Sequence, residues 1–224
     1  KNNVPLHLAS DIDLGGFDAN TAAESCDAQL HPLPFLNKQA FQGDNKIIKN
    51  LCYVHDIKDS VMSGPVGFFG AMPEGYAGNV LVKNVRIVIK DSREDREPTA
   101  AGKDFYPVGA FFGMAAMSTI ENVTLEDVTI NAPIAGGVAG YVGNSTVRNI
   151  LATDDLMVSN DIEITPYDGN FAGNVVGEMF SNALHENYST WPSEYTVFLG
   201  GVVGMAVQDS LYNIRVRGKV RDNS

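Results

Sequence analysis

Acidic side chains near the start of the chain have the type and spacing that ligand binding needs. Asp11 and Asp13 alternate with Ile12 and Leu14, and alternation along a strand puts both carboxylates on one face and both apolar side chains on the other. With the apolar face inward, the carboxylates point outward, where they could bind Ca²⁺ or a sugar hydroxyl. The simpler interpretation is that these acids form a solvated strand face.

A second candidate site is a segment rich in aromatic residues. Tyr188, Trp191 and Tyr195 lie close together, and Trp191 is the only tryptophan of the chain. Exposed aromatic rings stack on the apolar faces of sugar rings or anchor a protein partner. We therefore predict ligand-binding residues here. The alternative is that Trp191 only packs its own loop.

The two cysteines, Cys26 and Cys52, are either buried thiols or a disulfide. Two cysteines do not make a zinc site, and their spacing is not that of a Cys-x-x-Cys redox motif. We favour the disulfide, because Leu51 and Tyr53 look inward-facing and so turn Cys52 outward, toward a loop such as the one that carries Cys26.

Motifs of the common enzyme classes are missing from the sequence. It has no phosphate-binding Gly-x-x-x-x-Gly-Lys-Ser/Thr loop, no Gly-x-Ser-x-Gly elbow and no His-Glu-x-x-His helix, and its four histidines are isolated. We predict no catalytic residue, no cofactor and no metal site beyond the weak Ca²⁺ candidate. Acid pairs such as Glu126-Asp127 and Asp154-Asp155 leave open a carbohydrate-active enzyme, a polysaccharide lyase or a glycoside hydrolase, since paired acids do that chemistry.

Charge and hydropathy exclude two kinds of partner. The chain has 27 acidic and 16 basic residues, a net charge of −11, whereas a nucleic acid or an anionic membrane surface demands a basic patch. No apolar run is long enough for a membrane-spanning helix, so we expect no direct membrane insertion. We expect residues 1–224 to form one domain with a substantial core.

One short phrase recurs along the chain and predicts its architecture. It consists of a small residue, two or three mostly apolar residues and a glycine, and an asparagine follows at the head of an alternating segment; that asparagine lies nine residues after Gly113, Gly140 and Gly204. We expect the glycines to supply corners that a Cβ would obstruct, and the asparagines to adopt left-handed turns in which stacked side-chain amides hydrogen-bond. The predicted repeat residues are Gly70, Gly113, Gly140, Gly177, Gly204, Asn50, Asn84, Asn122, Asn149 and Asn213.

The spacing of these repeats predicts an irregular solenoid. Intervals between the asparagines fit a unit of about 26 residues with insertions, and the interval from Asn149 to Asn213 fits two units. Alternation around Val85, Ile87 and Ile89 predicts strands, and a change of parity predicts a bend at Glu126-Asp127.

The start of the chain resembles bacterial surface proteins with GLUG-type repeats. The segments that carry the resemblance are the "DIDL" strand within Leu8–Gly15, the phrase from Phe41 to Leu51, and Val66-Gly-Phe-Phe-Gly70. The resemblance implies an all-β fold, a right-handed parallel β-helix with about six irregular coils and long loop insertions, found in large secreted or cell-surface, adhesin-like proteins.

We therefore expect a non-catalytic adhesion or interaction module, secreted or on a bacterial cell surface. Its partners would be a glycan or a cell-surface protein, bound through the loop insertions at 17–34, 90–105 and 182–197, and further coils of a longer parent chain would cover its C-terminal edge.

Overall fold

The computed structural model describes residues 4–59, 62–93, 106–161 and 198–222. These residues form β-strands and no helix, and every strand pair is parallel. The main sheet is built on five long strands in the order β3 (Leu33–Asp56), β4 (Phe69–Lys90), β7 (Ser118–Asn131), β10 (Thr146–Asn160) and β13 (Ser210–Asp222). The prediction of an all-β, parallel structure is confirmed.

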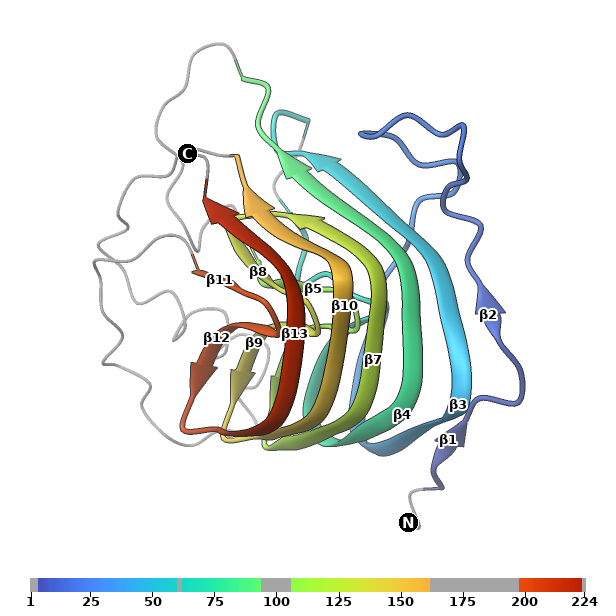
Figure 1. Ribbon diagram of the computed structural model, residues 1–224, viewed down its shortest axis with the longest axis vertical. Helices are drawn as coiled ribbons and strands as arrows, with labels where there is room; N and C mark the ends of the chain where they lie inside the picture. Colours follow the sequence, from blue (N-terminus) through green and yellow to red (C-terminus); the bar gives the residue numbers. More distant parts are fainter. Residues whose placement is uncertain (1–3, 60–61, 94–105, 162–197, 223–224) are drawn as a thin grey trace.

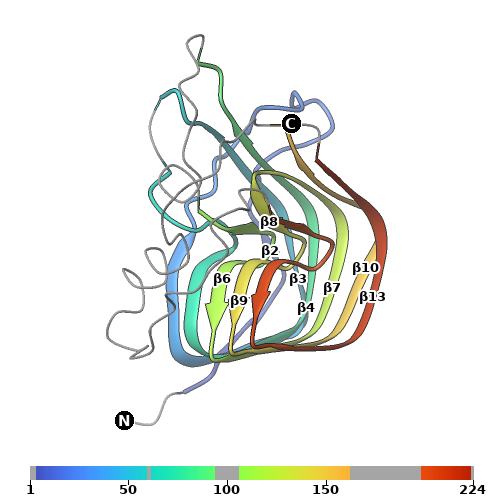
Figure 2. The ribbon, with the colours of Figure 1, turned by 90° about the vertical axis from the view of Figure 1, so that its left-hand side faces the viewer.

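Shorter strands join this arrangement at two places. β1 (Leu6–His7) and β2 (Ile12–Asp13) pair with β3, while β6 (Phe112–Ala116), β9 (Ala139–Gly143) and β12 (Val203–Val207) follow one another beside the first residues of β4. A second sheet contains β5 (Val108–Gly109), β8 (Ile134–Gly136) and β11 (Phe198–Gly200). The long strands bend, so the main sheet is concave toward the short strands (Figures 1 and 2).

Neighbouring strands stack residue on residue, and the inward rows form the core. One such row joins Ile48, Val82, Leu125 and Ala152, and all four side chains are fully buried. Each long strand alternates between this interior and the outer face, which is why the apolar residues recur with a period of two. We call one long strand together with the short strands that lead into it a level.

The predicted bend at Glu126-Asp127 is confirmed. Leu125 and Val128 are both buried although they lie three residues apart, and Asp127 between them has a φ of 52°. A single residue in the left-handed region changes the strand's direction and shifts its parity. Asn84 holds the equivalent position in β4, with a φ of 51°.

The recurring asparagines do form ladders, but there are two ladders instead of one. Asn213, Asn149 and Asn122 each donate an amide hydrogen bond to the asparagine of the preceding level, and the ladder continues to Asn79. Asn79 follows Gly70 by nine residues, the same step as in the later levels. The expected equivalence of Asn84 with Asn122 is therefore wrong, because β4 contains two left-handed asparagines and Asn84 occupies the second bend.

The second ladder runs through the other predicted asparagines. Asn84 donates to Asn50 at 3.1 Å, and Asn50 donates to Asp13 at 2.8 Å. Both asparagines have a positive φ, as expected for turn positions that only glycine, asparagine and aspartate adopt easily.

The interval from Asn149 to Asn213 does not correspond to two levels. β10 pairs directly with β13, so these two asparagines stand on adjacent strands. The phrase ending at Gly177 lies outside the described residues.

The repeat glycines allow close approach between levels. A Cβ on Gly204 would lie 2.7 Å from the carbonyl oxygens of both Ala135 and Gly140, and a Cβ on Gly113 or Gly140 would collide with the backbone of the preceding level. Gly70 is buried within β4. Gly113, Gly140 and Gly204 are thus positions where a Cβ would obstruct the packing of the levels, as the sequence predicts.

Candidate ligand-binding site

The loop between the first strands and β3 lies on the outer face of the main sheet. The backbone of Leu14 and Gly16 still pairs with β3, the chain then leaves the sheet, and it returns where Leu30 donates to the carbonyl of Cys52. A disulfide joins Cys26 in this loop to Cys52, with the Cα atoms 5.7 Å apart. The Cys52 side chain is turned away from the Leu51 core position and is covered by the loop.

Arg86, on the outer face of β4, contacts the same loop. Its neighbours Val85 and Ile87 are buried in the core, so its side chain must leave the other face of β4. One guanidinium nitrogen donates to the carbonyls of Ala22 at 2.8 Å and Ser25 at 3.2 Å. The guanidinium carbon also lies 4.2 Å from the centre of the Phe17 ring, a cation–π contact.

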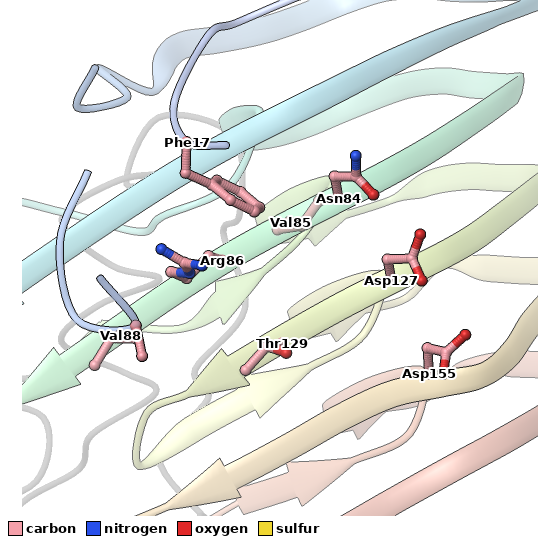
Figure 3. Close-up of a pocket in the computed structure, with 9 residues that line it drawn as sticks. Phe17, Asn84, Val85, Arg86, Val88, Asp127, Thr129 and Asp155 are labelled. Atoms are coloured by element: carbon pink, nitrogen blue, oxygen red, sulfur yellow. The ribbon is translucent and has the colours of Figure 1, made fainter. Parts of the chain in front are cut away.

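A groove of about 440 Å³ opens between this loop and the outer face of β4, β7 and β10 (Figure 3). An aromatic ring, a guanidinium, two carboxylates, an amide and a hydroxyl line it together with small apolar side chains. The lining residues are Phe17, Ala23, Asn84, Val85, Arg86, Val88, Asp127, Thr129 and Asp155. Of the acid pairs noted in the sequence, the structure thus brings Asp127 and Asp155 into one groove.

The second asparagine ladder stops inside the groove. The residue stacked on Asn84 in the next level is Asp127, and a carboxylate has no N–H to donate to the Asn84 amide oxygen. Asn84 is therefore followed by oxygen acceptors, Asp127 on β7 and then Asp155 on β10, where the register between these two strands shifts (Figure 3). These oxygens can accept hydrogen bonds from donor groups of a ligand.

The groove carboxylates are not in the surroundings that acid catalysis needs. Asp127 is about half exposed, at 47%, and its carboxylate lies 3.8 Å from the Lys83 ammonium; Asp155 is exposed as well. A general acid of a glycosidase is kept protonated by an apolar pocket. The hydrogen bond from Lys83 to Glu126 is the main cause that raises the pKa of Lys83, so this lysine stays a cation.

The two acids proposed for Ca²⁺ point outward as predicted but are used within the protein. Asp11 accepts a hydrogen bond from the backbone N–H of Ile47 at 2.9 Å. Asp13 accepts from Asn50 and Gly15 and lies 3.2 Å from the Lys49 ammonium. The Asn50 hydrogen bond is the main cause that lowers the pKa of Asp13. Within the described ranges, no group of three or more His, Cys, Asp or Glu side chains is placed to hold a metal ion.

The aromatic candidates Tyr188, Trp191 and Tyr195 lie outside the described residues. The sequence also gives no single motif for the groove, since Phe17, Arg86 and Asp155 come from distant segments. One signal was available: Asp127 stands at a ladder position held by asparagine in the preceding levels.

A second polar cluster on the outer face joins four levels. The Tyr76 hydroxyl donates to Glu121 at 2.8 Å, Arg148 is hydrogen-bonded to the other Glu121 oxygen, and Arg148 also donates to the Tyr212 hydroxyl at 2.8 Å. Burial is the largest single influence on Glu121 and raises its pKa, but the hydrogen bonds from Arg148 and Tyr76 and the charge of Arg148 together outweigh it, so the pKa of Glu121 is lowered. Burial is the main cause that raises the pKa of Tyr76. Because every member is hydrogen-bonded, we regard this cluster as structural.

Comparison of the chain with protein-family models, curated proteins and solved structures finds no match. No helix of the described part of the chain is long and apolar enough to cross a membrane.

Proposed function

We propose that the chain is a non-catalytic interaction module that binds a neutral glycan in the groove beneath the disulfide-linked loop. The observation that carries this proposal is the lining of the groove: an aromatic ring and apolar side chains beside a row of outward oxygen acceptors. Sugars present both an apolar ring face and many hydroxyl donors, and such a surface complements both.

The charge of the groove supports a neutral ligand over an acidic one. Asp127 and Asp155 are both carboxylates, and the Arg86 guanidinium is already bound to two loop carbonyls. The chain as a whole has a net charge of −11. A uronic or sialic acid would be repelled by this field, whereas sugar hydroxyls gain charge-assisted hydrogen bonds.

The parallel levels support a right-handed parallel β-helix as the scaffold of this module, as the GLUG-type resemblance implies. The Cys26–Cys52 disulfide supports a secreted or cell-surface location, because disulfides persist in oxidising compartments. In this proposal the loop at 17–34 carries the ligand contacts, and the framework of levels holds it in place.

The alternative, a glycoside hydrolase on the same scaffold, is favoured by one observation: the groove contains two carboxylates from adjacent strands. It predicts release of reducing sugar from a polysaccharide that the protein binds. The exposure of Asp127 favours binding without cleavage, because a general acid needs an apolar pocket that keeps it protonated.

A glycan array with the wild-type protein and an Asp127→Asn variant tests the proposal. Asparagine accepts the left-handed backbone of this position, and its amide can donate to Asn84, so the variant keeps or raises the melting temperature. It loses a charged acceptor, for which we expect about tenfold weaker binding to neutral glycans.

Asp59→Asn is the matched control, since Asp59 is an exposed acid outside the groove. It should bind as the wild type does. Equal binding by Asp127→Asn, or an array on which only acidic glycans bind, contradicts the proposal. Release of reducing sugar that stops in Asp127→Asn would favour the hydrolase.

A further inference from the structure

The last long strand leaves the interior rows of the protein open. β13 pairs with β10 on one side, and within the described part of the chain no strand pairs with its other side. Leu211, Val216 and Val220 are 46%, 39% and 47% exposed, whereas the residues stacked beneath them on β10 are fully buried. The exposed positions of β13 are thus core positions that lack a covering strand.

The first strands form a matching open edge at the other end of the sheet (Figure 1). Among the described residues, β1 and β2 pair with β3 only. Leu6 is 45% exposed, although Phe41, which is stacked against it, is buried. Both ends of the stack therefore expose the same inward rows.

The two edges carry opposite charges. β13 contains four basic residues, Arg215, Arg217, Lys219 and Arg221, of the 16 in the chain. The first strands carry the outward acids Asp11 and Asp13 on a protein that is acidic as a whole. Opposite charges on neighbouring parallel strands stabilise their pairing, and like charges oppose it.

The register of the levels aligns these charges. A single row runs from Ile12 through Ile48, Val82, Leu125 and Ala152 to Val216. A strand placed over β13 in the same register therefore sets Ile12 against Val216. The adjacent row then pairs Asp11 with Arg215, and the row after Ile12 brings Asp13 next to Arg217. Leu6 likewise falls over Leu211 through the row that contains Phe41 and Val147.

We propose that copies of this chain associate head to tail, with residues 6–13 of one copy added as parallel strands to β13 of the next. Leu6 and Ile12 then cover Leu211 and Val216, and Asp11 lies beside Arg215. The contact repeats the packing between the protein's own levels, so each added copy exposes a new β13 edge. The partner is a second copy of the chain, and this inference does not depend on glycan binding.

Sedimentation equilibrium of the wild-type chain and two charge reversals tests the proposal. Asp11→Lys changes the edge formed by residues 6–13, the head of a copy, and Arg215→Glu changes the β13 edge, its tail. Each variant places like charges in the row that joins residue 11 of one copy to residue 215 of the next. We expect the wild type to form dimers and longer species as its concentration rises, and each variant to associate about tenfold more weakly. Lys58→Glu, on the exposed turn after β3, is the control and should associate as the wild type does.

Mixing the two variants separates the contact from misfolding. In a mixture, every contact between unlike variants sets opposite charges in the shared row, because the unchanged Asp11 meets the unchanged Arg215 and the two reversed positions also attract each other. The mixture should therefore associate as the wild type does. The double variant, which carries both charge reversals, again places opposite charges in the shared row and regains self-association. A monomeric wild type at every concentration overturns the proposal. So does a mixture that stays monomeric although both variants keep the circular dichroism of the wild type.

Discussion

Asparagine in the left-handed region is the residue that defines each bend of the long strands. Asn122 has a φ of 53°, donates an amide hydrogen bond to Asn79 and accepts one from Asn149. Its backbone therefore tolerates few residue types, and its side chain ties three levels together. Asp127 breaks the second ladder at the point where the groove opens, so one exchange of amide for carboxylate separates the structural positions from the position that we propose binds the ligand.

Substitution of Asn122 separates the backbone contribution from the hydrogen bonds. Asn122→Gly keeps the left-handed backbone and removes only the amide, for which we expect a loss of about 1 to 2 kcal/mol in the free energy of unfolding. Asn122→Ala should cost about 1 to 2 kcal/mol more, because a Cβ is strained at this φ. Urea unfolding of both variants measures the difference. Equal losses for glycine and alanine would show that the backbone conformation carries no cost.

At the scale of the elements, hydrogen bonds along the outer face connect strands that are distant in sequence. Glu121 on β7 receives the Tyr76 hydroxyl from β4 and the guanidinium of Arg148 from β10, and Arg148 reaches Tyr212 on β13. Glu121 is only 14% exposed. Its ionised form thus holds four neighbouring strands in one register.

Stability should therefore depend on pH through Glu121. The folded-state pKa of this carboxyl lies below its ordinary value of 4.5, so its contribution is complete above about pH 4.5 and is lost as the pH falls through the folded pKa. Glu121→Gln should be less stable than the wild type at pH 7, and the difference should shrink in the acid range. Thermal unfolding from pH 7 to pH 3 measures this, and a difference that stays constant would contradict it.

Much of the strand architecture is predictable from sequence because it follows from local rules. Alternation identifies the inward side chains of β4, parity identifies the bend at Asp127, and the positions of Leu51 and Tyr53 turn Cys52 toward its loop. These features depend on a few consecutive residues and on the two-residue period of a strand.

The register between levels is not predictable in the same way. Asn84 heads a better alternating segment than Asn79, so the alternation selects the wrong partner for Asn122, although the nine-residue step from Gly70 leads to Asn79. β10 and β13 are adjacent although Asn149 and Asn213 are separated by 64 positions, since an insertion changes the spacing without changing the stack. The groove was missed for a similar reason, because the contact between Phe17 and Arg86 joins two segments that share no motif.

At the scale of the molecule, the levels form a scaffold and the groove lies on the outer face of its long strands. The groove exists only because the loop from the N-terminal part of the chain is held over three strands that come later. The links that hold it there include the Cys26–Cys52 disulfide, the Arg86 contacts, two hydrogen bonds between Gln29 and Val54, and the 3.3 Å ion pair between Lys90 and Glu24. The ion pair is exposed and contributes little, so the disulfide is the main covalent control over the site.

Binding by a Cys26→Ser/Cys52→Ser variant is the most direct test of the claim that this loop and the sheet together form the binding site. Loss of the disulfide should lower the free energy of unfolding by about 3 kcal/mol, while the levels away from the loop keep the β-sheet circular dichroism of the wild type. Calorimetric titration with the neutral glycan that binds best on the array should then show affinity about tenfold weaker or more. A folded variant that binds this glycan as tightly as the wild type would contradict the account.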